Sequence, residues 1–133
     1  MASELRVNTL KDASGNNSIA TSFVAGGSAK AWADIIGAGT PSVANSNNVS
    51  SLTDNGTGDT TISFTGSMDS GNYSIAGLSG SQSGAQWATA GINKYTGASS
   101  SCRVLRGYVV SFNGGATKFD YTELDFMLQG DLA

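Results

Sequence analysis

NVSSLTDNGTGDTTISFTGSMDSGNYSI, from Asn48 to Ile75, decides the fold of this chain. Apolar and polar residues alternate on both sides of a glycine-rich centre, which is the pattern of a half-buried β-hairpin. The centre, Asp54–Asp59, holds residues that tolerate positive φ and let the chain reverse. The stretch therefore predicts two antiparallel strands joined by a short turn. Its apolar members are Val49, Leu52, Ile62 and Phe64.

Short alternating segments continue on both sides of this hairpin. We expect further strands at residues 4–10, 18–25, 73–78, 86–93, 102–112 and 118–128, separated by turns rich in Gly, Ser and Asn. Residues 29–36 are ambiguous, because their alanines favour a helix while the flanking glycines and the short length favour a strand. No segment has a sustained 3.6-residue apolar repeat, so helix content should be low. The fold class expected is all-β, an antiparallel β-sandwich or jelly-roll-like domain.

The length and composition suit one small domain with an arm. The chain has 133 residues, of which 39% are hydrophobic and 13% charged, and Gly, Ser, Thr and Asn make up nearly half of it. Apolar residues that alternate in phase with polar ones do not match the composition of a disordered chain. We expect residues 1–26 to form an N-terminal extended arm and residues 27–133 to form the β-sandwich.

Charge and targeting signals exclude several partners. The net charge is −3 and the seven basic residues are scattered, so we expect no nucleic acid partner. No apolar run approaches the length of a membrane span, and the first residues lack the apolar core of a secretory signal. We therefore expect no membrane partner and synthesis in a cytoplasm. Cys102 is the only cysteine, which excludes an intrachain disulfide and indicates a small core residue.

The residue types needed for most catalytic sites are missing. The chain has no histidine, which removes Ser-His-Asp and Cys-His catalysis and any imidazole metal site. One cysteine cannot build a thiolate zinc cluster, and no glycine-rich nucleotide-binding motif lies between a strand and a helix. We expect no enzyme activity and no cofactor.

Two acidic motifs leave a chemical alternative. Asp54 and Asp59 flank a glycine-rich turn that could ligate calcium, but the spacing of known calcium loops is absent, which favours a turn capped by an aspartate. Glu123 and Asp125 share one strand face about 6–7 Å apart, near the lower limit for an inverting glycosidase. A solvated acidic face explains the second pair without chemistry.

Arg106 interrupts an otherwise apolar strand face. Its guanidinium needs a carboxylate if it is buried, and Asp120 on the following strand is the natural partner. The pair has two interpretations, and the sequence does not favour either of them. One is an intersubunit salt bridge in an oligomer, and the other is an edge-exposed arginine whose stem covers apolar surface.

Aromatic residues are the candidates for contact with a host glycan, since sugars stack on flat rings. The binding candidates are Tyr95, Trp87 and Tyr73. Small residues flank Trp32 and Trp87, which more often indicates tight packing in a core. Tyr95 lies in a polar loop and is the best candidate for an exposed contact.

The motifs together resemble a known family. The Asn48–Ile75 stretch, KAWADIIGAGTPSV at Lys30–Val43 and FDYTELDFMLQGD at Phe119–Asp131 are similar to the small C-terminal β-domain of bacteriophage tail fibres and other virion fibres. CRVLR at Cys102–Arg106 resembles the penultimate strand of that domain. The opening SELRVNTLKDASGNNSI resembles the starts of marine phage fibre and appendage proteins. One departure is Ala33-Asp34-Ile35, where the family has Val-Asn-Phe.

The resemblance implies a short trimeric virion fibre or spike, made in the host cytoplasm and displayed on the particle for attachment to a host glycan. It also implies that residues 29–36 form a strand. Its expected partners are other copies of the chain and other virion proteins of the capsid or tail. The expected oligomer interface contains Arg106 and Asp120, together with Tyr121 and Met127, which we expect on the outward face of the strand at residues 118–128.

The alternative is a capsid decoration or tail adaptor protein with no receptor role. In that case the N-terminal arm anchors the protein by adding strands to, or burying its apolar residues against, another virion protein. The anchoring candidates are Leu5, Val7 and Leu10. Dependence on the arm for incorporation into particles would separate this alternative from a receptor-binding fibre tip.

Overall fold

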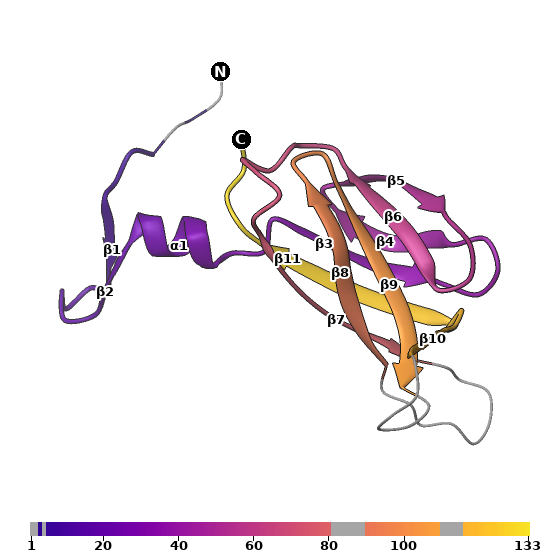
Figure 1. Cartoon of the computed structure of the whole chain (residues 1–133). Helices are drawn as coiled ribbons and strands as arrows, with labels where there is room; N and C mark the ends of the chain where they lie inside the picture. The colour runs from indigo at the N-terminus through magenta and orange to yellow at the C-terminus, as the bar shows by residue number, and fades with distance from the viewer. Residues whose placement is uncertain (1–2, 4, 81–89, 110–115) are drawn as a thin grey trace.

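The computed structural model describes residues 3, 5–80, 90–109 and 116–133, and it has an arm and a β-sandwich (Figure 1). The arm contains β1 (Thr9–Lys11), β2 (Ser18–Ala20) and α1 (Thr21–Gly27). The sandwich begins with β3 (Ala31–Ile36). Its two antiparallel layers confirm the all-β sandwich predicted from the alternating segments.

The first sheet has the strand order β4-β3-β11-β7. The other strands of this sheet are β4 (Ser42–Asn47), β7 (Ser74–Gly80) and β11 (Glu123–Gln129). Buried and exposed residues alternate strictly along β3 and β11, because one side of the sheet faces the core and the other faces solvent. The strand that the resemblance implied for residues 29–36 is therefore confirmed as β3.

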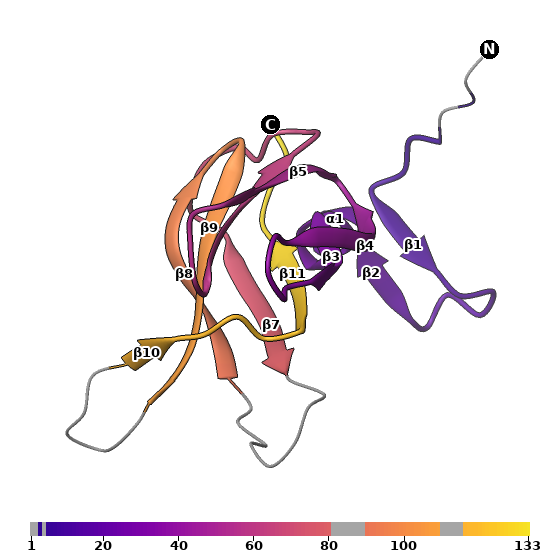
Figure 2. The ribbon, with the colours of Figure 1, turned by 90° about the vertical axis from the view of Figure 1, so that its right-hand side faces the viewer.

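The second sheet has the order β8-β9-β6-β5, and a short strand, β10 (Ala116–Lys118), pairs with β9. Its main strands are β5 (Val49–Asp54), β6 (Asp59–Phe64), β8 (Ala90–Ala98) and β9 (Ser101–Val109). Strands β5 and β6 are the predicted hairpin. In the part of the chain that is described, two residue pairs between β7 and β8 join the two sheets at one edge. Figure 2 shows the layers on either side of the core.

The core lies between the inward faces of the two sheets. Its buried members are Ala31, Ala33, Ile35, Ile62, Phe64, Met68, Tyr73, Cys102, Val104, Leu124, Phe126 and Leu128. The rings of Phe64 and Tyr73 meet edge to face at 6.0 Å. Cys102 is fully buried, as predicted for a small core residue.

Asn48 fixes the corner where the chain passes from the first sheet to the second. Among the described residues it is the one other than glycine with a positive φ, at 58°. Its side-chain amide donates to the carbonyl oxygens of Lys30 and Gly66, and its Oδ1 accepts from the Gly66 amide. Asparagine is among the few residues that tolerate this backbone region and can bond locally.

Several predicted elements differ from the observed ones. The strand predicted for residues 18–25 ends at Ala20 and continues as α1, a helix with no buried residue and no side-chain cap. The strand predicted for 118–128 is interrupted between β10 and β11. Strand β8 starts later and ends later than the predicted 86–93. Residues 86–89 and the predicted loop at Asn113–Gly115 lie outside the described residues.

Candidate functional site

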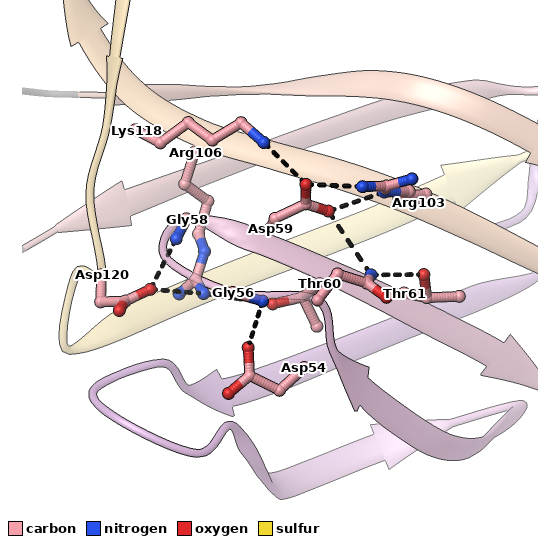
Figure 3. Close-up of polar contacts among 11 residues, drawn as sticks. Asp54, Gly56, Gly58, Asp59, Thr60, Thr61, Arg103, Arg106, Lys118 and Asp120 are labelled. Carbon is pink, nitrogen blue, oxygen red and sulfur yellow. Dashed lines mark hydrogen bonds and ion pairs between the residues drawn. The ribbon is translucent and has the colours of Figure 1, made fainter.

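The turn between β5 and β6 carries a group of charged residues that are paired within the chain (Figure 3). Asp54 Oδ1 accepts from the Gly56 amide at 2.9 Å, so the predicted aspartate cap of the turn is confirmed. Asp59 is only 2% exposed. Its carboxylate accepts from Arg103 Nε and Nη2 at 2.7 and 2.8 Å and from Lys118 Nζ at 2.7 Å.

These contacts lower the pKa of Asp59 well below its usual value. The hydrogen bonds from Arg103 lower the pKa most, and the hydrogen bond from Lys118 lowers it further. Burial acts in the opposite direction and cancels part of this effect. A carboxylate with two cationic donors stays ionised at any ordinary pH and is not a general acid. This group could not be predicted from the sequence, because Arg103 and Lys118 are 44 and 59 residues from Asp59 along the chain.

Arg106 is buried between the layers, only 2% exposed, and its partners all belong to its own chain. Nη2 lies 3.5 Å from Asp120 Oδ1 and 3.1 Å from Thr60 Oγ1. Burial lowers the pKa of the guanidinium and the Asp120 carboxylate opposes this. The predicted pairing with Asp120 is therefore confirmed. Both readings of Arg106 are wrong, because a side chain buried in one copy is neither exposed at an edge nor accessible to a second copy.

Gly58 holds Asp120 in place at this end of the sandwich. Its amide donates to Asp120 Oδ1 at 2.7 Å, and its φ of 64° lies in the left-handed region. A Cβ at this position would lie 2.6 Å from the Arg106 carbonyl oxygen and 2.7 Å from the Phe119 nitrogen. Only glycine fits both the backbone conformation and the space.

The three predicted glycan contacts do not gather on one surface. Tyr73 is 5% exposed, and its hydroxyl donates to the Ser101 carbonyl at 2.7 Å, so it is a core residue and not a ligand contact. Burial raises the pKa of that hydroxyl. Tyr95 is 59% exposed, and the Cζ atom of Arg103 lies 5.0 Å from the centroid of the Tyr95 ring. Trp87 lies outside the described residues.

Two expectations about the first sheet need correction. Tyr121 is 3% exposed and not outward-facing, because the break between β10 and β11 resets the alternation before it. Trp32, expected in the core, is 38% exposed, since the neighbouring alanines Ala31 and Ala33 face inward instead. Met127 is exposed, as predicted.

The solvent side of the first sheet is a mixed apolar and acidic surface, which we call the outer face. Trp32 pairs with Met127 across β3 and β11, and Asp34 pairs with Asp125 in the next outward row. The same face continues onto β7, where Leu78 lies opposite Asp125. The outer face comprises Trp32, Asp34, Ile36, Leu78, Glu123, Asp125 and Met127.

Crowded carboxylates change the acidity of this face. The pKa of Asp125 is raised, first by burial and then by the charges of Asp34 and Glu123. Glu123 and Asp125 lie on the open side of a sheet with apolar neighbours, which supports the reading as an acidic surface. The described residues contain no group of three or more acidic or cysteine side chains arranged to hold a metal ion.

The arm exposes its apolar residues. None of its described residues is buried, and the predicted anchoring residues Leu5, Val7 and Leu10 are 81%, 40% and 43% exposed. Phe23 on α1 is 74% exposed. Within the part of the chain that the structure describes, we find no helix with the length and hydrophobicity needed to cross a bilayer.

Comparison with other proteins adds no relative. The chain matches no family model, no curated protein and no solved structure. The fold and the surfaces described above are therefore the basis on which a function can be argued.

Proposed function

We propose that this chain is a structural protein of a bacteriophage particle that displays its β-sandwich and attaches through its N-terminal arm. The motif resemblance supports a virion role. The observation that carries the attachment role is the arm itself, which has secondary structure without a buried residue. A two-stranded hairpin and a helix of seven residues are each marginal in water, so this arm needs a partner surface to become stable.

Between the two sequence-based alternatives, this favours the arm-anchored decoration or adaptor protein. Burial of Leu5 and of Phe23 against another protein would contribute roughly 1.5–3 kcal/mol for each side chain, which is a substantial part of the free energy that an attachment contact needs. The proposed role needs neither catalysis nor a cofactor.

Particles purified from an infected culture that carries this gene test the proposal. We expect mass spectrometry to find the chain in washed particles and an antibody against the sandwich to label their surface. The double substitution Leu5→Ser with Phe23→Ser should reduce incorporation by roughly tenfold or more. Leu132→Ser, which changes an exposed leucine outside the arm, is the matched control. Absence of the chain from washed particles would contradict the proposal.

Receptor contact is a second candidate function, favoured by one observation. The Tyr95 ring is 59% exposed, and a flat, exposed aromatic ring suits stacking against a sugar. Binding of the purified chain to an array of bacterial glycans should be lost in Tyr95→Ala. It should persist in Trp32→Ala, which removes an exposed aromatic ring from the opposite sheet.

A further inference from the structure

The turn between β5 and β6 contains a pair of neighbouring residues that can react with each other. Asn55 precedes Gly56, and both are exposed. The backbone nitrogen of a glycine can attack Cγ of a preceding asparagine, because no Cβ shields its approach. The new N–Cγ bond closes a succinimide ring, the Cγ–Nδ2 bond breaks, and Nδ2 leaves as ammonia with the proton of the glycine nitrogen. Water then opens the ring and leaves aspartate or isoaspartate, each with a new carboxylate.

The closed turn holds the two nitrogens that take part in this reaction. The Gly56 amide donates to Asp54 Oδ1 at 2.9 Å, so its proton lies against a carboxylate (Figure 3). Loss of that proton would place a second negative charge beside the first, which is unfavourable. Asn55 Nδ2 donates to Thr61 Oγ1 at 2.8 Å and to Asp59 Oδ1 at 3.4 Å. Departure of Nδ2 as ammonia must break both of these bonds.

The backbone of the turn is held as well. The Asn55 amide donates to the Asp59 carbonyl oxygen, and the Asp59 amide donates to the Gly56 carbonyl oxygen, both at 2.9 Å. The succinimide ring includes the backbone atoms that join Asn55 to Gly56, so its closure needs freedom at the point where these two bonds fix the chain. The reaction therefore requires local opening of the turn, whose free energy cost is absent in an unfolded chain.

The product fits the turn less well than the amide does. At position 55 it replaces the Nδ2 donor, 3.4 Å from Asp59 Oδ1, by a negatively charged acceptor, so two carboxylates repel where a hydrogen bond was made. Asp59 is buried and cannot turn away without releasing Arg103 and Lys118. Isoaspartate also adds one methylene to the main chain between the two backbone hydrogen bonds. Closure of the turn is therefore less favourable after the reaction than before it.

We propose that Asn55 is a latent modification site, at which the closed β5–β6 turn blocks conversion of the side-chain amide to a carboxylate and the product then weakens the turn. The co-reactant is water, so the reaction needs no enzyme. Each conversion adds one negative charge and marks a copy in which this end of the sandwich has opened. The inference is independent of the arm and of its proposed role in attachment.

Peptide mapping of the full-length chain tests the block. The purified protein is incubated at mildly alkaline pH with and without guanidinium chloride, and aspartate and isoaspartate at Asn55 are followed over time. Asn113-Gly114, the second such pair in the sequence, lies on a different tryptic peptide and is counted separately. We expect Asn55 to convert roughly tenfold or more slowly in the folded chain than in the unfolded chain. Equal rates would overturn the inference, as would an Asn55 that stays unconverted in the unfolded chain.

Thr61→Val tests the contact that holds the reacting amide. The change removes the hydroxyl that accepts from Nδ2 and keeps the shape and strand preference of the side chain. Conversion at Asn55 should rise several-fold in the folded variant, whereas Thr9→Val, the same change at an exposed threonine of β1, should leave it unchanged. A rate equal to that of the wild type would overturn the role of this contact. If circular dichroism shows that Thr61→Val is unfolded, the comparison of folded and unfolded wild type decides.

Asn55→Asp measures the effect of the product, because it carries the new carboxylate from the start. Its midpoint of urea unfolding should lie below that of the wild type and below that of Asn55→Ser, which loses the amide without gaining a charge. An Asn55→Asp chain as stable as Asn55→Ser would overturn the claim that the product weakens the turn. None of these results bears on the proposed function, which depends on finding the chain in particles.

Discussion

Carboxylates occupy two contrasting regions of this molecule. At the β5–β6 turn, Asp59 is buried under Arg103 and Lys118, and its pKa is lowered. On the outer face, Asp125 lies opposite Asp34, and its pKa is raised. The first region uses charge to fix the fold of one copy. The second leaves two facing carboxylates to repel each other, which destabilises the sheet of a single copy.

The largest effect should come from Gly58, which positions Asp120 against the buried Arg106. Gly58→Ala puts a Cβ at positive φ and within 2.7 Å of two backbone atoms, so the turn must shift. Gly39 has almost the same φ, 65°, but has no atom within 4 Å of the added Cβ. We expect Gly39→Ala to cost about 1–2 kcal/mol of unfolding free energy and Gly58→Ala roughly twice that. Urea titration of both variants measures the difference. Equal losses would contradict the close approach.

A smaller loss should follow from removing the buried charge itself. Asp59→Asn removes the negative charge and replaces one of the two carboxylate oxygens that accept from Arg103 and Lys118 by a donor, and it should cost about 2–3 kcal/mol, moderated because Arg103 and Lys118 can reach water. Asp69→Asn, at an exposed aspartate, should change little.

This loss should depend on pH in a defined direction. The folded pKa of Asp59 lies below the usual 3.8, so its contribution is complete above that value and disappears as pH falls through the folded pKa. The difference in unfolding free energy between wild type and Asp59→Asn should therefore shrink in acid. A difference that is constant from neutral to strongly acidic pH would exclude an ionised, bonded Asp59.

The smallest effect should have the opposite sign. Asp125→Asn removes repulsion from Asp34 and should stabilise the isolated chain by roughly 0.5 kcal/mol at neutral pH. Because the folded pKa of Asp125 is raised, the cost of its charge appears as pH rises above the usual 3.8. The gain should vanish in acid, and Asp131→Asn should show none. A lower unfolding free energy for Asp125→Asn than for the wild type would mean that this carboxylate stabilises the folded chain.

Much of the fold was predictable, because it follows from local alternation. The Asn48–Ile75 hairpin, the inward face of β11 and the core position of Cys102 needed only a period of two and turn chemistry. The strand predicted for residues 18–25 was partly wrong. Phe23 and Val24 are adjacent apolar residues, which match neither the two-residue period of a strand nor the 3.6-residue period of a helix over so short a length. The outward orientation predicted for Tyr121 was wrong because the strand is interrupted between β10 and β11. The alternation of β11 therefore does not extend back to Tyr121, and no local sequence pattern marks the interruption.

The surfaces were less predictable than the fold. Trp32 was assigned to the core from its small neighbours, but in a strand those neighbours face the opposite side and are themselves the core. The Arg106–Asp120 pair was found from the cost of burying a lone guanidinium, although whether it joins one copy or two could not follow from sequence. The outer face required the register between β3, β7 and β11, which is a property of the assembled sheet.

The single thiol gives this protein a built-in chemical reporter. Cys102 has no exposed surface, and burial raises its pKa, so the reactive thiolate is scarce while the sandwich stays closed. Labelling by a thiol reagent then proceeds only through opening of the layers, and its rate measures how often they separate. Folded copies should also run as single chains on a non-reducing denaturing gel when free thiols are blocked during unfolding, because the one thiol of each copy is buried in its core.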